Sequence, residues 1–214
     1  MPRVSDEHLE RRRQQILDAA RICFVRKGFH QTSMQDVFTE SGLSAGAVYR
    51  YFKSKDELVI ALASTAAGDI RAQMTAVIDS DPLPTPAELV GQMTDWISAQ
   101  SGPEGRIRLA PQAWSLALID EDAAAPVRQT LAGIRGMWRA YAERMRTAGW
   151  LPPDADLDAV AAALFGLLPG FVLQHLILGD PVREEYLRGV ETLFPYGTPG
   201  TRPRHEPTTV ADPA

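Results

Sequence analysis

A short segment of the chain has the residue types of a helix that can lie close against DNA bases. The string SAGAVYRYFKSKDEL begins at residue 44. Within it Gly46 has no side chain, and Ala45 and Ala47 carry only methyl groups. A helix with so shallow a face can bring its backbone near base edges in the major groove, where methyl groups can contact thymine. Arg50 is the one strong base-edge donor in this predicted helix, and its guanidinium suits guanine.

Polar side chains around this segment suit the phosphate backbone. Hydroxyl groups, an ammonium group and a helix N-terminus can all contact phosphate oxygens, which positions a protein on DNA without reading the sequence. The candidates for these contacts are Thr32, Ser33, Tyr49, Tyr51 and Lys55, and Ser44 at the start of the helix completes the set of predicted DNA contacts. The two tyrosines could instead pack in the core. The run Arg11–Arg13 could be a solvated face, although one of these arginines, or Arg3, could touch DNA.

Two short helices joined by a tight turn would hold these residues. The spacing of residues 32–35 is that of a capping box between Thr32 and Gln35, which predicts a capped helix over 32–41. Gly42 tolerates a positive φ in the turn, and Ser44 can cap a third helix that runs to residue 51. This arrangement is typical of a helix-turn-helix.

The rest of the chain is also predicted to be helical, so the fold class is all-α with about nine helices. Apolar residues recur at helical spacing, and strand-like alternation is scarce. A first helix ends at Gly28, a capping box at 54–57 opens a long fourth helix to about residue 78, and Pro111 should break or kink the sixth. The later helices are expected at about 86–100, 104–119, 123–148, 154 or 156–178, and 180–194.

Charge divides the chain into parts that face different partners. The 214 residues include 22 basic and 27 acidic ones, a net charge of −5. Residues 1–58 hold ten basic and eight acidic residues, a net of +2, so the remainder carries −7. We expect a DNA-binding domain at 1–58, a larger helical domain at 59–194 and a disordered, proline-rich tail at 195–214.

The sequence lacks the motifs of several enzyme classes, including a Gly-rich phosphate loop, H-E-x-x-H and G-x-S-x-G. The aspartates at 154, 156 and 158 lack the glycine and the distal glutamate of a calcium loop, and are interpreted as helix caps. Cys23 is the only cysteine, there is no asparagine for N-glycosylation, and residues 1–8 do not resemble a secretory signal. We expect a non-enzyme without cofactor or metal, in the reducing cytoplasm.

The apolar residues of the larger domain suggest a ligand pocket and a buried helix. The candidates for pocket lining are Trp96, Trp114, Trp138 and Phe171, with Gln174 and His175 as polar partners of a ligand. Aromatic residues at helical spacing could equally be ordinary core. The uncharged run Ala159–Leu173 is 15 residues long and contains Pro169. We interpret this run as too short for a membrane span and therefore as buried within protein.

The motif from Ser44 to Leu58, preceded by the capped helix, resembles the TetR family of bacterial transcriptional regulators over residues 8 to about 60. The resemblance implies a homodimer joined through its last two helices, a palindromic DNA operator and repression that a small molecule relieves through the larger domain. Two other classes stay open. One is a ligand-binding or scaffold protein of the same fold that does not read DNA, and the other is a membrane-anchored helical protein.

Overall fold

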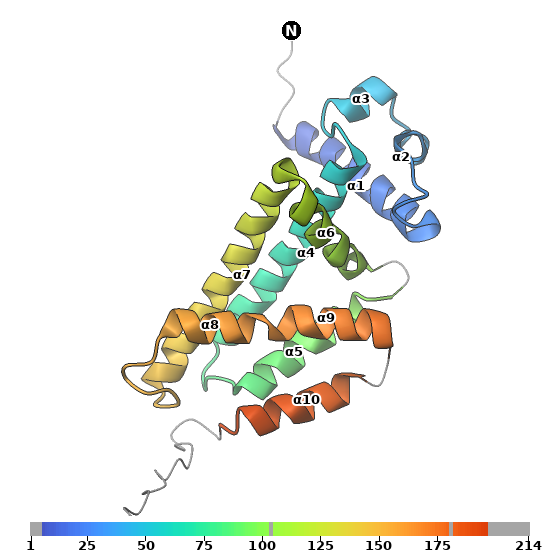
Figure 1. The fold of residues 1–214 in the computed structure, drawn as a ribbon. Coiled ribbons are helices and arrows are strands. Elements are labelled where there is room, and N and C mark those ends of the chain that lie inside the picture. Colours follow the sequence, from blue (N-terminus) through green and yellow to red (C-terminus); the bar gives the residue numbers. More distant parts are fainter. Residues whose placement is uncertain (1–5, 103–104, 180–181, 197–214) are drawn as a thin grey trace, which may run out of the picture.

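The computed structural model describes residues 6–102, 105–179 and 182–196, and in these ranges the chain is helical without strands, which confirms the all-α prediction (Figure 1). Its elements, in chain order, are α1 (Asp6–Lys27), α2 (Met34–Ser41), α3 (Ala45–Tyr49), α4 (Lys55–Ile78), α5 (Pro86–Ala99), the short 3-10 helix η1 (Arg106–Leu109), α6 (Ala110–Ile119), α7 (Glu121–Thr147), α8 (Leu157–Phe165), α9 (Leu167–Leu178) and α10 (Val182–Leu193).

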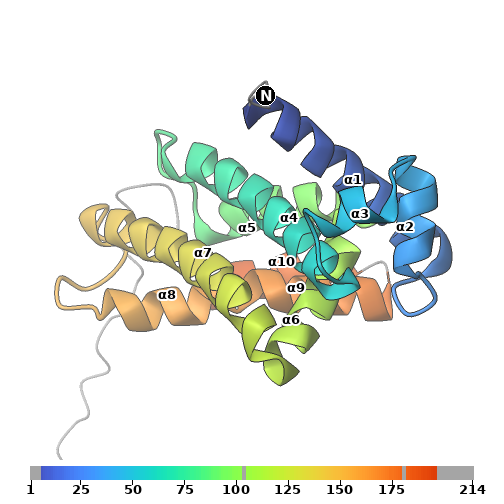
Figure 2. The same ribbon diagram turned by 90° about the horizontal axis from the view of Figure 1, so that it is seen from above.

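Helices α1, α2 and α3 gather at one end of the molecule around the beginning of α4 (Figures 1 and 2). Their apolar side chains converge on one hydrophobic core because each helix buries one stripe of its surface. The largest members of this N-terminal core are Ile16, Leu17, Phe24, Val37, Phe38, Val48, Phe52 and Leu58. The core fixes how α3 is held relative to the other two helices.

Side-chain caps determine where the short helices begin. Ser33 precedes α2, and its hydroxyl accepts a hydrogen bond from the Asp36 amide while the Asp36 carboxylate accepts one from the Ser33 amide. The capping box therefore lies one residue later than the predicted pair at 32–35, and that prediction is wrong. Gly42 closes α2 with φ 66°, and Ser44 caps α3, both as the sequence predicts.

The second, larger core lies among the remaining helices. Helix α7 packs along α4 and against α8, while α5 contacts α4, α9 and α10 (Figure 1). Trp138 and Tyr141 on α7 are fully buried there, with ring centroids 6.1 Å apart in an edge-on arrangement. At the far end of α4, the Arg144 guanidinium on α7 donates to the carbonyl oxygens of Ile78 and Ser80, so α7 holds the end of α4 in place.

The later helices keep the predicted order with three differences. The helix expected over 104–119 is divided into η1 and α6, because Pro111 has no amide hydrogen and fits the first turn of a new helix. Asp156 caps α8 as predicted, but the helix is interrupted at Gly166, where α9 begins. In the predicted tail, Tyr196 stacks on Trp150 with centroids 5.8 Å apart, and residues 197–214 lie outside the described residues.

Helices α8 and α9 leave an apolar face uncovered. Taken as one 22-residue helix, Leu157–Leu178 is long and apolar enough to cross a membrane by length and composition. The prediction that this segment is too short for a membrane span, which counted only residues 159–173, is therefore wrong. Only 28% of the most apolar 18-residue stretch of this helix is buried inside the chain. Phe171 lies in the core, whereas Ile177 and Leu178 are 75% and 70% exposed. Leu173, Ile177 and Leu178 give α9 three of the exposed large apolar side chains among the described residues.

Removal of the Tyr141 hydroxyl should destabilise the fold. This hydroxyl donates a 2.6 Å hydrogen bond to the Pro84 carbonyl in a buried site, and burial raises the pKa of the phenol. In Tyr141→Phe the carbonyl loses its donor, so we expect the free energy of unfolding to fall by about 1–3 kcal/mol, measured by urea denaturation. Tyr49→Phe, at an exposed ring, is the control and should change stability by less than about 0.5 kcal/mol. Equal stability of the two variants would contradict this assignment.

Candidate nucleic-acid interface and ligand cavity

The outer face of α3 is shallow and exposed. The Ser44 hydroxyl accepts a 3.3 Å hydrogen bond from the Ala47 amide and fixes the start of the helix. Val48 points into the core, whereas Ala45 and Gly46 are exposed. A β-carbon built on Gly46 would meet no atom within 4 Å, so packing within the fold does not require glycine there. The flat surface leaves room for a close approach from outside.

Two larger side chains extend from the end of α3. The Tyr49 ring packs edge-on against Phe38 of α2 with centroids 5.3 Å apart, which holds its position although the residue is 42% exposed. Arg50 is exposed and forms no hydrogen bond or ion pair within the described ranges of the chain. Lys53, which sequence reasoning did not single out, is also exposed and donates to the Tyr49 carbonyl at 2.7 Å. Its position one turn after Tyr49 is the signal that could have identified it.

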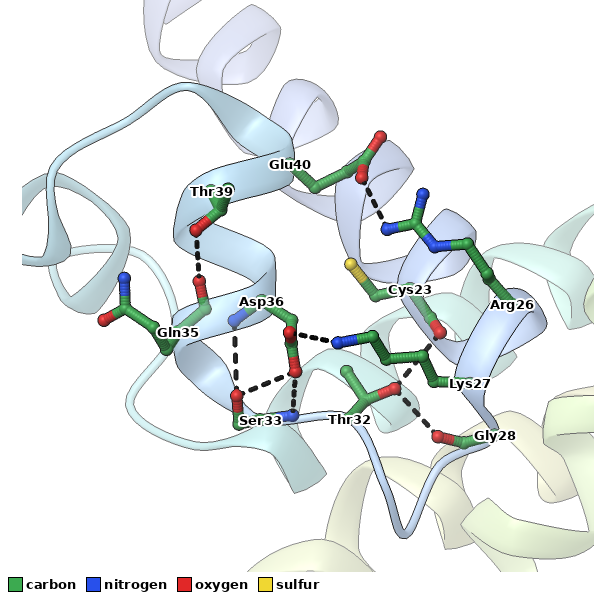
Figure 3. A network of polar contacts seen from close by, with 10 residues as sticks. All are labelled: Cys23, Arg26, Lys27, Gly28, Thr32, Ser33, Gln35, Asp36, Thr39 and Glu40. Atoms are coloured by element: carbon green, nitrogen blue, oxygen red, sulfur yellow. Dashed lines mark hydrogen bonds and ion pairs between the residues drawn. The ribbon is translucent and has the colours of Figure 1, made fainter.

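The residues before α2 form a polar network that joins α1 to α2 (Figure 3). Ser33 is exposed, but its hydroxyl already pairs with Asp36, which in turn binds the Lys27 ammonium. Thr32 is only 2% exposed, and its hydroxyl donates to the carbonyls of Cys23 and Gly28. The predicted phosphate contact of Thr32 is therefore corrected: its hydroxyl points inward and is used to hold the end of α1.

Lys55 and Tyr51, both predicted phosphate contacts, are only half-exposed. The Lys55 ammonium donates to the Phe29 carbonyl at 2.9 Å and lies 4.3 Å from the centre of the Phe29 ring. This contact ties the start of α4 to the loop before α2. Tyr51 is half-buried against the N-terminal core. Of the predicted set, the structure thus brings together on one exposed face Ser44, Ala45, Gly46, Tyr49 and Arg50, with Ala47 half-buried beside them.

The arginines at 11–13 lie on α1 and have partners within it. Arg11 and Arg13 form ion pairs with Glu7 and Glu10 at 3.7 Å, and Arg12 donates to the Gln15 side chain at 2.8 Å. Arg13 also lies over the Phe52 ring. The run therefore behaves largely as a solvated face, and Arg3 lies outside the described residues.

A cavity of about 70 Å³ lies among the helices that follow α3, between α4, α6, α7 and the α8–α9 pair. Its lining residues are apolar apart from the hydroxyls of Ser64 and Thr130 and the indole N–H of Trp114. Of the predicted ligand residues, Trp114 lines this cavity. Trp114 also packs against both hydrophobic cores, so it lies between the cavity and the core that includes the N-terminal helices.

The other predicted ligand residues do not line the cavity. Trp138 and Phe171 are fully buried in the core, and Trp96 packs on its edge. Gln174 is exposed and donates to the Gly170 carbonyl, while the His175 ring stacks on Phe171 at 5.4 Å. The sequence pattern identified the apolar helices but not how each helix is turned about its own axis. That orientation decides which side chains face the cavity.

Protonation of Asp36 should weaken the N-terminal domain. Hydrogen bonds from Lys27, and then from the Ser33 amide and hydroxyl, hold the pKa of this carboxyl well below its ordinary value of 3.8. Because the pKa is lower in the folded state, this carboxylate stabilises the fold above pH 3.8, and the contribution is lost as the pH falls toward the folded pKa. We expect Asp36→Asn to be less stable at neutral pH and to lose less stability on acidification, measured by urea denaturation across pH. Asp154→Asn, at an exposed loop carboxyl, should keep the acid dependence of the wild type; the same dependence in Asp36→Asn would contradict the assignment.

Comparison with known proteins supports the interpretation of the N-terminal helices. Residues 16–62 match the family model described as bacterial regulatory proteins, tetR family. The chain is 51% identical over 57 residues to the uncharacterized HTH-type transcriptional regulator YfiR of Bacillus subtilis, covering 27% of this chain and 28% of that protein. It is 36% identical over 99 residues to the HTH-type transcriptional repressor Rv1474c of Mycobacterium tuberculosis, covering 46% of this chain and 48% of that protein. These two alignments span less than half of each relative.

Longer similarities extend into the larger part of the chain. The HTH-type transcriptional regulator TtgR of Pseudomonas putida is 28% identical over 190 residues, which cover 85% of this chain and 88% of that protein. Salmonella enterica GusR superposes with a TM-score of 0.66 at 18% identity, over 91% of this chain and 100% of that chain. Bacillus subtilis FadR, solved in complex with stearoyl-CoA, superposes with a TM-score of 0.66 at 18% identity, over 83% of this chain and 96% of that chain. At these identities the structures establish the fold.

Proposed function

Since the chain carries the N-terminal domain of the tetR family of bacterial regulatory proteins and belongs to that family, we propose that it is a ligand-responsive repressor that reads DNA with α3. The observation that carries this proposal is the exposed, shallow face of α3, where Gly46 is not required by packing and Arg50 is free of partners within the described ranges. A groove-binding helix needs both features, because its backbone must come close to the bases and a donor must reach them.

The exposed residues divide into two roles on DNA. Ala45, Gly46 and Ala47 would face base edges, with Arg50 donating to guanine. Tyr49, Ser33 and the start of α3 at Ser44 would contact phosphate, which sets the register. Thr32 has no role in this arrangement. Lys55 and Tyr51 act mainly by holding the domain together, and Lys53 adds an exposed positive charge beside Tyr49.

A second copy of the chain would cover the exposed face of α9. Leu173 and Ile177 are four residues apart and so lie on the same side of the helix, and both are exposed. A homodimer through α8–α9 and α10 would bury these residues. It would also place two copies of α3 about 34–36 Å apart, or a multiple of that distance, to match the half-sites of a palindromic operator. Burial by a second copy would account for the apolar surface without a membrane.

The effector would enter the cavity beside Trp114. A ligand that prefers the arrangement unable to bind DNA would shift the population toward it, whereas equal affinity for both arrangements would shift nothing. FadR of Bacillus subtilis was solved with stearoyl-CoA, which supports ligand binding as a property compatible with this fold. Release of DNA by a ligand would make the chain a sensor rather than a constitutive repressor.

The other open class is a protein of the same fold that binds a ligand without reading DNA. The two classes differ in salt dependence. Phosphate contacts release counterions, so the affinity of a regulator for DNA falls steeply as salt rises. A scaffold that does not read DNA would show weak association at every salt concentration. The chain offers variants that separate the two outcomes.

Substitution of Gly46 should abolish DNA binding without unfolding the protein. A leucine there meets no atom of the fold at its β-carbon but would hold α3 away from the bases. We expect wild-type protein to enrich a palindrome from random duplexes and genomic fragments, and Gly46→Leu to bind it about tenfold more weakly or worse. Arg50→Ala should cost about 1–3 kcal/mol and relax specificity at one position.

Gly136→Leu is the matched control, because Gly136 on α7 is exposed and its β-carbon would also meet no atom within 4 Å. This variant should enrich the same palindrome as the wild type. Failure of wild-type protein to enrich any sequence at low salt, after bound ligands have been stripped, would overturn the DNA-binding proposal.

Charges on the exposed face of α9 should separate the dimer. In the double variant with Leu173→Glu and Ile177→Glu, burial against a second copy would place carboxylates in an apolar interface, which is costly. We expect a dimer for the wild type and a monomer for the variant by sedimentation equilibrium. Leu118→Glu is the control, because Leu118 is 87% exposed at the end of α6 and this variant should stay dimeric. A monomeric wild type, or one that sediments with lipid vesicles, would refute the dimer proposal.

A further inference from the structure

The wall of the cavity contains no charged side chain. Its lining comes from α4, α5, η1, α6, α7, α8 and α9, and its residues are apolar except for the hydroxyls of Ser64 and Thr130 and the indole N–H of Trp114. Two ionic groups next to lining residues in the sequence, Arg106 and Asp69, are paired with each other at 3.0 Å. An ionised ligand would therefore lose its hydration without gaining a counter-charge, which is strongly unfavourable.

The hydroxyls of Ser64 and Thr130 are the groups of the wall that can both donate a hydrogen bond to a ligand and accept one from it. Within the described parts of the chain, neither the Ser64 hydroxyl nor the Thr130 hydroxyl forms a hydrogen bond, and both residues are half-buried. They lie on α4 and α7, on two of the helices that enclose the cavity. A ligand can therefore satisfy one or two polar groups here, and its remaining surface must be apolar.

The size of the cavity restricts how a ligand can bind. An apolar cavity of about 150 Å³ accommodates benzene. The cavity here is about 70 Å³, so a ligand of that size must push its walls apart. Among these walls, Ala113 and Trp114 of α6 also pack against the N-terminal core. Expansion at this place would therefore also change the packing of that core, which includes residues of α1, α2, α3 and α4.

From this wall we infer that the effector is an uncharged, predominantly apolar small molecule with at most one or two hydrogen-bonding groups, and that carboxylates and amines of the same size are rejected. The inference rests on the proposed function, because it gives the chemical class of the ligand for that regulator. Its consequence is that the chain senses compounds that partition from water into apolar phases, not ionic metabolites.

Four compounds that share one ring test the chemical class in the absence of DNA. Toluene and benzyl alcohol are neutral, whereas benzoate and benzylamine are charged at neutral pH. We expect the neutral pair to raise the melting temperature of the full chain and to bind at least about tenfold more tightly than the charged pair, measured by thermal denaturation and titration calorimetry. Tighter binding of benzoate or benzylamine, or no binding of any of the four, would overturn the inference.

Variants of the wall establish where the compounds bind. Ala63→Phe fills the cavity from α4 and should remove the shift caused by toluene. Thr130→Arg adds a positive charge to the wall and should shift the preference toward benzoate, whereas Gln129→Arg, at the exposed neighbouring position, should behave as the wild type. A toluene shift that persists in Ala63→Phe would mean that the compound binds elsewhere, which contradicts the proposed site.

These outcomes are separate from those of the DNA experiment. Selective binding of neutral compounds without any enriched DNA would leave the ligand class intact and overturn the regulator. Enrichment of a palindrome together with tighter binding of the charged compounds would support the regulator and overturn the ligand class.

Discussion

Helix α4 belongs to two hydrophobic cores at once, and the arrangement of the whole chain depends on this. Leu58 and Leu62 near its start are buried among α1, α2 and α3, whereas Met74 and Ile78 near its end are buried in the larger core. Because the helix is continuous over 24 residues, neither core can shift along it independently. The middle of α4 forms one wall of the cavity, so the apolar site lies on the element that connects the two cores.

The N-terminal helices show how a fold can leave one surface free for another molecule. Val48 anchors α3 in the core and Phe38 holds the Tyr49 ring, so the helix is fixed from behind. Lys55 and Thr32 use their polar groups to secure the loops on either side. The side chains that remain outside are small, apart from Tyr49 and Arg50. A rigid helix with an unobstructed face binds at a low cost in entropy, because little of it must be ordered on contact.

The sequence was most informative where local chemistry decides the structure. Glycine at 42 and serine at 44 specify the turn and the start of α3 almost alone, because a positive φ and a side-chain cap involve only neighbouring residues. It was less informative where two residues could serve equally. Thr32 and Ser33 both have the spacing of a cap. In the structure the Thr32 hydroxyl donates to carbonyls at the end of α1, and Asp36, the partner of Ser33, also binds Lys27 of α1. These contacts lie outside the motif. The cavity was beyond the reach of local patterns, because its wall combines residues of helices that are distant in sequence.

The Arg144 contact holds the C-terminal end of α4, so a rotation of the helix about this end would move its N-terminal end farthest. The guanidinium ties the carbonyls of Ile78, the last residue of α4, and Ser80 to α7, so Ile78 would be the pivot of a rotation of the helix. At about 1.5 Å of rise per residue, the cavity wall near Ala66 lies about 18 Å from that point and Lys55 about 35 Å from it. A displacement at the cavity is thus roughly doubled at the start of α4, simply by the ratio of the two arm lengths. If α4 turned as a rigid rod about Ile78, a widening of the cavity would therefore displace the N-terminal helices about twice as far as the cavity wall.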